Sequence, residues 1–194
     1  MKTDKDLYIM GEIIDGDELA VAIVGTRTPS EYGLRMAKRF SAGLAKRRVT
    51  VISGLARGID TAAHKAAIAA GGRTIAVLGS GLDIIYPPEN KELAREIAAN
   101  GAVITAFPPG TKPLGKNFLA RNSLIAGLSR AVLVVEGRRK SGTISTATHA
   151  ANLSRHVFAV PGKLDSPLSE APNYLIREGA HLARSVDDIL DTIL

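Results

Sequence analysis

Apolar and polar positions along the chain repeat one theme: a short apolar run, a turn rich in glycine or polar residues, and an amphipathic stretch. Short β-branched or alanine-rich runs predict buried strands, and apolar residues spaced three or four apart predict helices. The predicted strands are 20–24, 49–52, 74–78, 102–105, 131–135 and 157–160; the predicted helices are 31–48, a stretch that ends near Gly71, 89–100, 117–128, 143–153 and most of 174–194. Residues 7–10 are a candidate edge strand.

Near-continuous apolar strands that alternate with helices are typical of a parallel sheet covered on both faces. The pattern therefore predicts an α/β fold: a doubly wound, mostly parallel, Rossmann-like sheet. The chain shows no long linker, repeat or low-complexity segment. We expect a single domain over residues 1–194, in which 1–18 form an added edge segment.

Composition narrows the function classes. The absence of cysteine excludes disulfides, thiolate zinc sites and a cysteine nucleophile. A charged start and the lack of a long apolar run predict a soluble, cytoplasmic protein without a membrane partner. The 25 Lys and Arg against 19 Asp and Glu give a net charge of +6, which favours a polyanionic partner. Aromatic residues make up only 4%, which argues against an extended base-stacking surface.

Glycines and small polar residues follow at least five of the predicted strands. In a doubly wound sheet, ligands bind beyond the carboxyl ends of the strands, where glycine lets backbone N–H groups approach an anion. Basic residues fall at or beside the same strand ends: Arg27, Arg57, Lys112, Lys116, Arg121, Arg138, Arg139 and Lys140. Clustered arginines suit forked recognition of phosphate oxygens. The run 138–140, taken alone, is better interpreted as a solvated turn.

The known nucleotide fingerprints are absent. Gly25 is followed by Thr26 and Arg27 rather than by a G-x-G-x-x-G pattern, and Ser53 stands where an acid would hold a ribose. There is no P-loop. The four histidines lack metal-ligand spacing, and a triad of Ser53, His64 and Asp60 has no nucleophile elbow. We therefore predict no metal, no cofactor and no catalytic residue.

Several segments, taken together, resemble the DNA-processing protein A (DprA/Smf) family. They are VAIVGTR at 21–27, SGLARGID at 53–60 with Ala63 and His64, LGSGLD at 78–83 with Tyr86 and Pro87, Phe118, 121–122, 125–129, 141–143, FAVPG at 158–162, 175–176 and 179–180. The resemblance covers the chain from about residue 7 onward. It implies a Rossmann-like domain that binds single-stranded DNA, forms a homodimer and delivers DNA to the RecA recombinase during natural transformation and recombination.

The resemblance also implies which residues line the DNA pocket. Arg27, Arg57, Phe118, Arg121 and the segment 112–116 match the family at pocket positions. Combined with the glycine turns and basic residues, this gives the predicted DNA- and phosphate-binding set: Gly25, Thr26, Arg27, Ser53, Gly54, Arg57, Gly58, Lys112, Lys116, Phe118, Arg121, Asn122, Lys140, Ser141 and Gly142.

The chain departs from the family pattern at three places. Ala106 replaces a usual acid, Ser123 replaces a common arginine, and residues 169–172 interrupt a usually glycine-rich approach to Asn173. We expect no separate N-terminal helical module and no C-terminal winged-helix module.

Two other functions stay open. Nucleoside-monophosphate phosphoribohydrolases of related fold use P-G-G-x-G-T-x-x-E after the long strand, and Arg121, Gly142 and Thr143 fit parts of that site. The position of their catalytic glutamate, however, falls on Ser145 or Thr146, neither of which can act as a carboxylate acid or base. A protein-interaction scaffold with a vestigial pocket is the third possibility.

Overall fold

The computed structural model describes residues 7–194, so the first six residues of the expected edge segment lie outside it. The strands are β1 (Tyr8–Gly11), β2 (Ala20–Val24), β3 (Thr50–Ser53), β4 (Thr74–Val77), β5 (Ala102–Thr105), β6 (Ala131–Val134), β7 (His156–Ala159) and β8 (His181–Leu182). The helices are α1 (Glu31–Lys46), α2 (Ile59–Ala69), α3 (Lys91–Ala99), α4 (Gly115–Gly127), α5 (Gly142–Asn152), α6 (Glu170–Arg177) and α7 (Val186–Ile193). Short 3₁₀ turns span Asp15–Glu18, Pro88–Asn90 and Pro167–Ser169.

The eight strands form one sheet in the order β1-β5-β4-β3-β2-β6-β7-β8. β1 runs antiparallel to β5, and the other neighbours pair in parallel. This confirms both the predicted Rossmann-like sheet and the edge strand expected at residues 7–10. The chain order reverses at β2, which lies between β3 and β6. Such a reversal leaves a crevice at the carboxyl ends of the two diverging strands.

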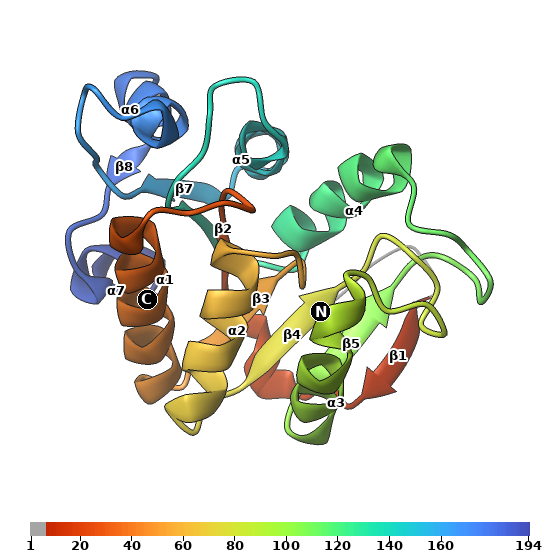
Figure 1. Cartoon of the computed structure of the whole chain (residues 1–194). Helices are drawn as coiled ribbons and strands as arrows, with labels where there is room; N and C mark the ends of the chain where they lie inside the picture. The colour runs from red at the N-terminus through yellow and green to blue at the C-terminus, as the bar shows by residue number, and fades with distance from the viewer. Residues whose placement is uncertain (1–6) are drawn as a thin grey trace.

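Helices cover both faces of the sheet because the central strands are apolar on both sides. Along β2, Val21 and Ile23 pack toward α1, α2 and α7, whereas Ala22 and Val24 pack toward α4 and α5. A third apolar cluster joins α3 to β4 and β5. In Figure 1, α1, α2 and α3 stand side by side in front of the sheet, with α4 and α5 on the other side.

The end of the chain is mostly helical, as predicted for 174–194, but the helical residues belong to two helices. The end of α6 and the whole of α7 are separated by the short strand β8. The first of them, α6, stops at Arg177 because Gly179 takes a φ of +100°, a backbone conformation that glycine adopts readily. Ser185 then starts α7 by accepting a hydrogen bond from the backbone N–H of Asp188.

Within the described residues, no helix has both the length and the apolar character needed to cross a membrane.

Candidate functional site

A cavity of about 550 Å³ opens at the carboxyl edge, where the strand order reverses. Four segments line this switch-point cavity: the turn 24–28 at the end of β2, residues 56 and 60 beyond β3, one face of α4, and residues 137–146 after β6. Two of these segments follow the strands that diverge at the reversal, which is where ligands bind in open α/β sheets. The fold therefore positions the cavity without any special insertion.

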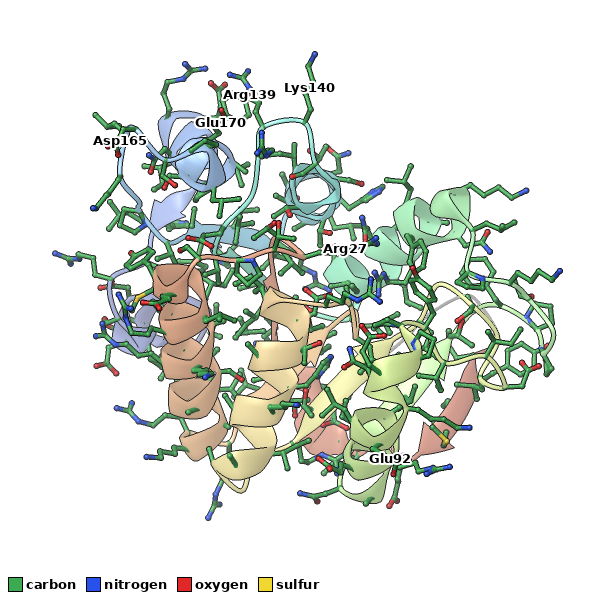
Figure 2. The ribbon with its side chains drawn as sticks, viewed as in Figure 1. Arg27, Glu92, Arg139, Lys140, Asp165 and Glu170 are labelled. Atoms are coloured by element: carbon green, nitrogen blue, oxygen red, sulfur yellow. The ribbon has the colours of Figure 1, made fainter. Side chains whose placement is uncertain are left out.

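The turn after β2 is held tightly against its neighbours. A Cβ atom at Gly25 would lie 2.6 Å from Cγ1 of Ile59, so only glycine fits there. The backbone N–H of Thr26 donates to the carbonyl of Glu136 at 2.7 Å, and its carbonyl accepts from Ile59 N–H at 3.2 Å. This rigid turn presents Arg27, whose exposed side chain reaches toward α4 (Figure 2).

An aromatic ring, that of Phe118, lies close to two arginines at one wall of the cavity. The guanidinium carbons of Arg27 and Arg121 are 5.3 Å and 5.8 Å from the centroid of the Phe118 ring. Tyr86 adds a tilted ring contact with a centroid separation of 5.7 Å. Among residues 7–194, no acidic side chain forms an ion pair with Arg27. Arg27 therefore has donors available for an anion beside an apolar ring.

Arg121 has a different environment, because its side chain is buried. Its Nη1 donates to the backbone carbonyls of Gly54 at 2.6 Å and Val77 at 2.5 Å, while its Nε has no partner. Burial lowers the pKa of this guanidinium to about 10, and the nearby Asp60 acts in the opposite direction. Arg121 thus stays charged at neutral pH. It ties together the ends of β3 and β4 while it lines the cavity.

Asp60 is the acidic partner of this buried arginine. Its Oδ2 accepts from the backbone N–H groups of Gly54 at 3.1 Å and Ala56 at 3.4 Å. Burial raises the pKa of the Asp60 carboxyl, and Arg121 together with these hydrogen bonds opposes the rise. Asp60 is also the one acidic side chain, within the described part of the chain, that lines the cavity.

The N-termini of α1 and α5 both lie at this edge, and of these two only that of α1 is capped by a side chain. At α1, the Ser30 hydroxyl accepts from Gly33 N–H at 3.2 Å. The buried Glu136 carboxylate in turn accepts from the Ser30 N–H at 2.9 Å and from its hydroxyl at 2.5 Å. At α5, the N-cap Ser141 makes no capping hydrogen bond, and its buried hydroxyl oxygen has no partner. The N-terminus of α5 therefore faces the cavity with its backbone N–H groups uncapped by a side chain.

In the basic segment 138–140 after β6, two side chains line the cavity and the third packs on α6. Arg138 and Lys140 line the cavity. Arg139 turns away: its backbone N–H donates to Glu170 Oε2 at 3.2 Å, and its guanidinium lies 3.7 Å from the centroid of the Tyr174 ring. Figure 2 shows Arg139 beside Glu170, with Lys140 extending outward from the loop. The backbone N–H of Gly137 donates to the carbonyl of Leu168 in the 3₁₀ turn before α6, and the Ala171 N–H of α6 donates to the Gly137 carbonyl, so the loop is also attached through its backbone.

The structure brings most of the predicted set together. The residues that line the cavity are Gly25, Thr26, Arg27, Phe118, Arg121, Asn122, Lys140, Ser141 and Gly142. Gly54 and Arg57 line a small adjoining recess that shares Arg27 and Phe118 with the cavity. The Arg57 guanidinium is already paired with the exposed Glu89.

The remaining predicted residues lie outside both spaces. Ser53 is fully buried, and its hydroxyl donates to the carbonyl of Ile23 at 2.7 Å. Gly58 lies at the N-cap of α2, packed on the backbone of Thr26 and Arg27. Lys112 and Lys116 are exposed but line neither the cavity nor the recess.

Sequence reasoning missed several lining residues. Thr143 and Thr146 lie one helical turn apart on α5 and both line the cavity, so the helical period after Gly142 could have revealed them. Asp60 and Tyr86 stood in recognised segments without an assigned role. No group of three or more histidine, aspartate or glutamate side chains in the range 7–194 is arranged to hold a metal ion.

The family model described as DNA recombination-mediator protein A matches residues 2–194. The chain belongs to this family. Among its curated relatives, Protein Smf from Synechocystis is 44% identical over 96% of this chain and 48% of its own length. Protein Smf from Escherichia coli is 44% identical over 96% and 50%. DNA processing protein DprA from Streptococcus pneumoniae is 45% identical over 88% and 60%. The chain thus spans about half the length of the curated relatives it matches.

Solved structures agree with this membership. The X-ray structure of DprA from S. pneumoniae superposes with a TM-score of 0.89 and 41% identity, over 97% of this chain and 66% of that one. DNA processing protein A from Helicobacter pylori, described for its single-stranded DNA binding mode, gives a TM-score of 0.86 and 32% identity over 96% and 85%. A molybdenum cofactor binding protein from Rippkaea orientalis, at 18% identity and a TM-score of 0.64, shares the fold alone.

Proposed function

We propose that this member of the DNA recombination-mediator protein A family binds single-stranded DNA in the switch-point cavity. Phosphate oxygens bind at Arg27, at Lys140 and at the open N-terminus of α5, and an unpaired base lies against Phe118. The observation that carries the proposal is Arg27: its guanidinium lies beside the half-buried Phe118 ring in a cavity at the reversal of strand order, and no acidic side chain of residues 7–194 forms an ion pair with it. The H. pylori relative, which binds single-stranded DNA, supports it.

A single strand fits this site better than a duplex. The cavity is a concave slot between loops, and a stacking contact requires the face of a base, which is covered in a duplex. Phosphate contacts and ring stacking are both insensitive to base identity. We therefore expect preference for single strands with little dependence on sequence.

We propose binding without catalysis. The α5 positions at which a phosphoribohydrolase would need its glutamate are Ser145 and Thr146, and Thr146 donates its hydroxyl to the carbonyl of Gly142 at 3.4 Å. The cavity's acidic residue, Asp60, is engaged by two backbone N–H groups and by Arg121. Incubation with nucleoside monophosphates should release no free base; turnover that Arg121→Ala abolishes would contradict this.

We further propose that the protein acts as a homodimer and delivers DNA to RecA, as the family resemblance implies. The C-terminal region supplies apolar surface for self-association, since Leu182 is exposed and Leu175 and Ile176 are only partly buried. Light scattering at micromolar concentration should report a dimer. A monomer at that concentration would contradict the self-association.

The decisive experiment is a titration of single-stranded against double-stranded oligonucleotides of matched length at several salt concentrations. The expected result is tighter binding of the single strand, with an affinity that falls as salt rises, because phosphate contacts release counterions. Equal affinity for the duplex would overturn the proposed function.

A further inference from the structure

A second cavity, of about 610 Å³, opens at the same carboxyl edge beyond β6 and β7. We call it the Tyr32 cavity. Its main lining residues are Ser30, Tyr32, Arg35, Glu136, Pro161 and Lys163. It is built partly by the segment FAVPG at 158–162, one of the segments that carry the family resemblance, which the switch-point cavity does not use.

The two cavities share one thin wall. Thr28 lines the switch-point cavity and Ser30 lines the Tyr32 cavity, two residues further along the same turn. On the opposite side, Gly137 lines the first cavity and Glu136 the second. A strand that left the switch-point cavity across the turn 28–30 would therefore enter the Tyr32 cavity.

The walls of the Tyr32 cavity are fixed before any ligand enters. The Tyr32 hydroxyl donates to the carbonyl of Pro161 at 2.7 Å, which sets the orientation of the ring. The Asn173 side chain holds the neighbouring Gly162 at both backbone groups, accepting from its N–H at 3.2 Å and donating to its carbonyl at 3.0 Å. A ligand gains affinity from such a site because little ordering remains to be done on binding.

The distribution of charge favours a base inside and a phosphate at the rim. The buried carboxylate of Glu136 lies at the wall, where it would repel a phosphate. Exposed Arg35 and Lys163 supply the positive charge at the rim. Exposed Glu31 also lines the cavity, and its 3.9 Å contact with Arg35 is the one ion pair that this arginine makes among residues 7–194. Such an exposed pair costs little to break.

We propose that the Tyr32 cavity is a second nucleotide subsite for the same single strand. The base lies against Tyr32 and Pro161, and its phosphate is held by Arg35 and Lys163. Lone pairs left on the Glu136 carboxylate accept from an exocyclic amino group, so a base that carries one binds better than thymine. This inference rests on the proposed function, since the strand reaches the second subsite through the first.

The test compares oligonucleotide lengths. Deoxycytidine oligonucleotides of increasing length are titrated against the wild-type protein, the Arg35→Ala/Lys163→Ala double variant, and a control. The control is Lys38→Ala/Arg39→Ala, which removes the same charge from exposed positions of α1 outside both cavities. Circular dichroism melts confirm that each variant is folded.

The expected result is a gain in wild-type affinity of about tenfold once the strand is long enough to fill both cavities. The double variant should lose this gain, and its salt slope on long strands should fall by about 0.7, corresponding to the loss of one neutralised phosphate. It should bind the shortest oligonucleotides like the wild type, and the control should resemble the wild type at every length. Thymidine oligonucleotides should show a smaller gain with length.

Two results would overturn the second subsite: a double variant that matches the control at all lengths, or one that weakens short and long strands equally. Arg27→Ala, run alongside, keeps the two proposals distinguishable. If Arg27→Ala weakens the binding of short strands while the double variant has no effect, the switch-point cavity binds DNA and the Tyr32 cavity does not. If Arg27→Ala leaves short strands unaffected, the proposed function itself fails.

Discussion

The N-termini of α1 and α5 lie at the same edge of the sheet, but only that of α1 has a side-chain cap. At α1 the protein supplies its own anion, since the Glu136 carboxylate accepts two hydrogen bonds from Ser30. At α5 the Ser141 side chain makes no cap, and the helix end faces the switch-point cavity. In dinucleotide-binding Rossmann folds the pyrophosphate sits at the first helix N-terminus. Here the Glu136 carboxylate occupies that position, so we expect a bound anion at the N-terminus of α5 instead.

The contrast shows how one feature of the fold can serve structure at one place and a ligand at another. A carboxylate of the chain at a helix N-terminus stabilises the folded protein. A helix N-terminus without such a cap can instead stabilise the complex with a bound anion. Substitutions at the two ends should therefore change different measurable quantities.

The largest change in stability is expected at the N-terminus of α1, which Ser30 and Glu136 cap. Glu136→Ala leaves the Ser30 donors without their charged acceptor in a buried position and should lower the free energy of unfolding by about 3 kcal/mol. Urea denaturation measures the change. Ser141→Ala at the open end removes a hydroxyl that has no partner and should change stability by less than about 0.5 kcal/mol. Equal losses at the two ends would remove the contrast.

Arg27→Ala tests the ligand side of the contrast. Loss of a charge-assisted phosphate contact should weaken single-strand binding by about 1–3 kcal/mol and reduce the salt slope by about 0.7. Stability should change little, because the Arg27 side chain is exposed and makes no ion pair within the described residues.

Arg121→Ala provides the comparison for that experiment. It should weaken binding as well, but it also removes the donor to Gly54 and Val77 and leaves Asp60 buried without its cation. A melting temperature unchanged by Arg121→Ala would show that the buried arginine has no structural role.

Ser141→Asp should give the N-terminus of α5 the side-chain cap that it lacks. A carboxylate at the N-cap of α5 should raise stability by about 0.5–1 kcal/mol, because it caps free N–H groups and complements the helix dipole. The same charge stands where a phosphate should bind, so single-strand affinity should fall by about 1 kcal/mol. Parallel urea and oligonucleotide titrations measure the two changes. If both quantities moved in the same direction, the end of α5 would not be the anion site.

The smallest effects are expected from Arg39→Ala and Arg95→Ala, which remove the same charge as Arg27→Ala at exposed helical positions. Arg95 is paired with Glu92 on α3, and Figure 2 shows Glu92 well away from Arg27; neither Arg39 nor Arg95 lines the cavity or the recess. Both variants should bind single strands within about 0.5 kcal/mol of the wild type. If they matched Arg27→Ala, binding would be a diffuse effect of net charge.

The sequence was sufficient to predict the sheet because buried parallel strands are continuous apolar runs, and 20–24 and 102–105 match β2 and β5. The end of the chain was harder, since the break between α6 and α7 depends on the conformation of Gly179. The glycine turn at Gly25 and the arginine within it were readable from residue type and position. The sequence could not show which of these arginines is available to a ligand, because Arg27 and Arg121 differ only in their burial and in their hydrogen-bond partners.

The capping of α1 could not have been predicted either. Glu136 is 106 positions away from Ser30 in the sequence, and only the pairing of β2 with β6 brings the two together. Local pattern carries no information about such a contact. The same holds for Arg139, which the sequence placed in a solvated basic turn and the structure places on the Tyr174 ring.

Because the segment 137–140 is attached to α6, motions of this cavity wall should be coupled to motions of that helix. Gly137 exchanges backbone hydrogen bonds with Leu168 and Ala171, and Arg139 is clamped to Glu170 and Tyr174. A strand that stiffens this wall should also slow the opening motions of α6. Amide hydrogen exchange would then register occupancy of the cavity as slower deuterium uptake across residues 168–174.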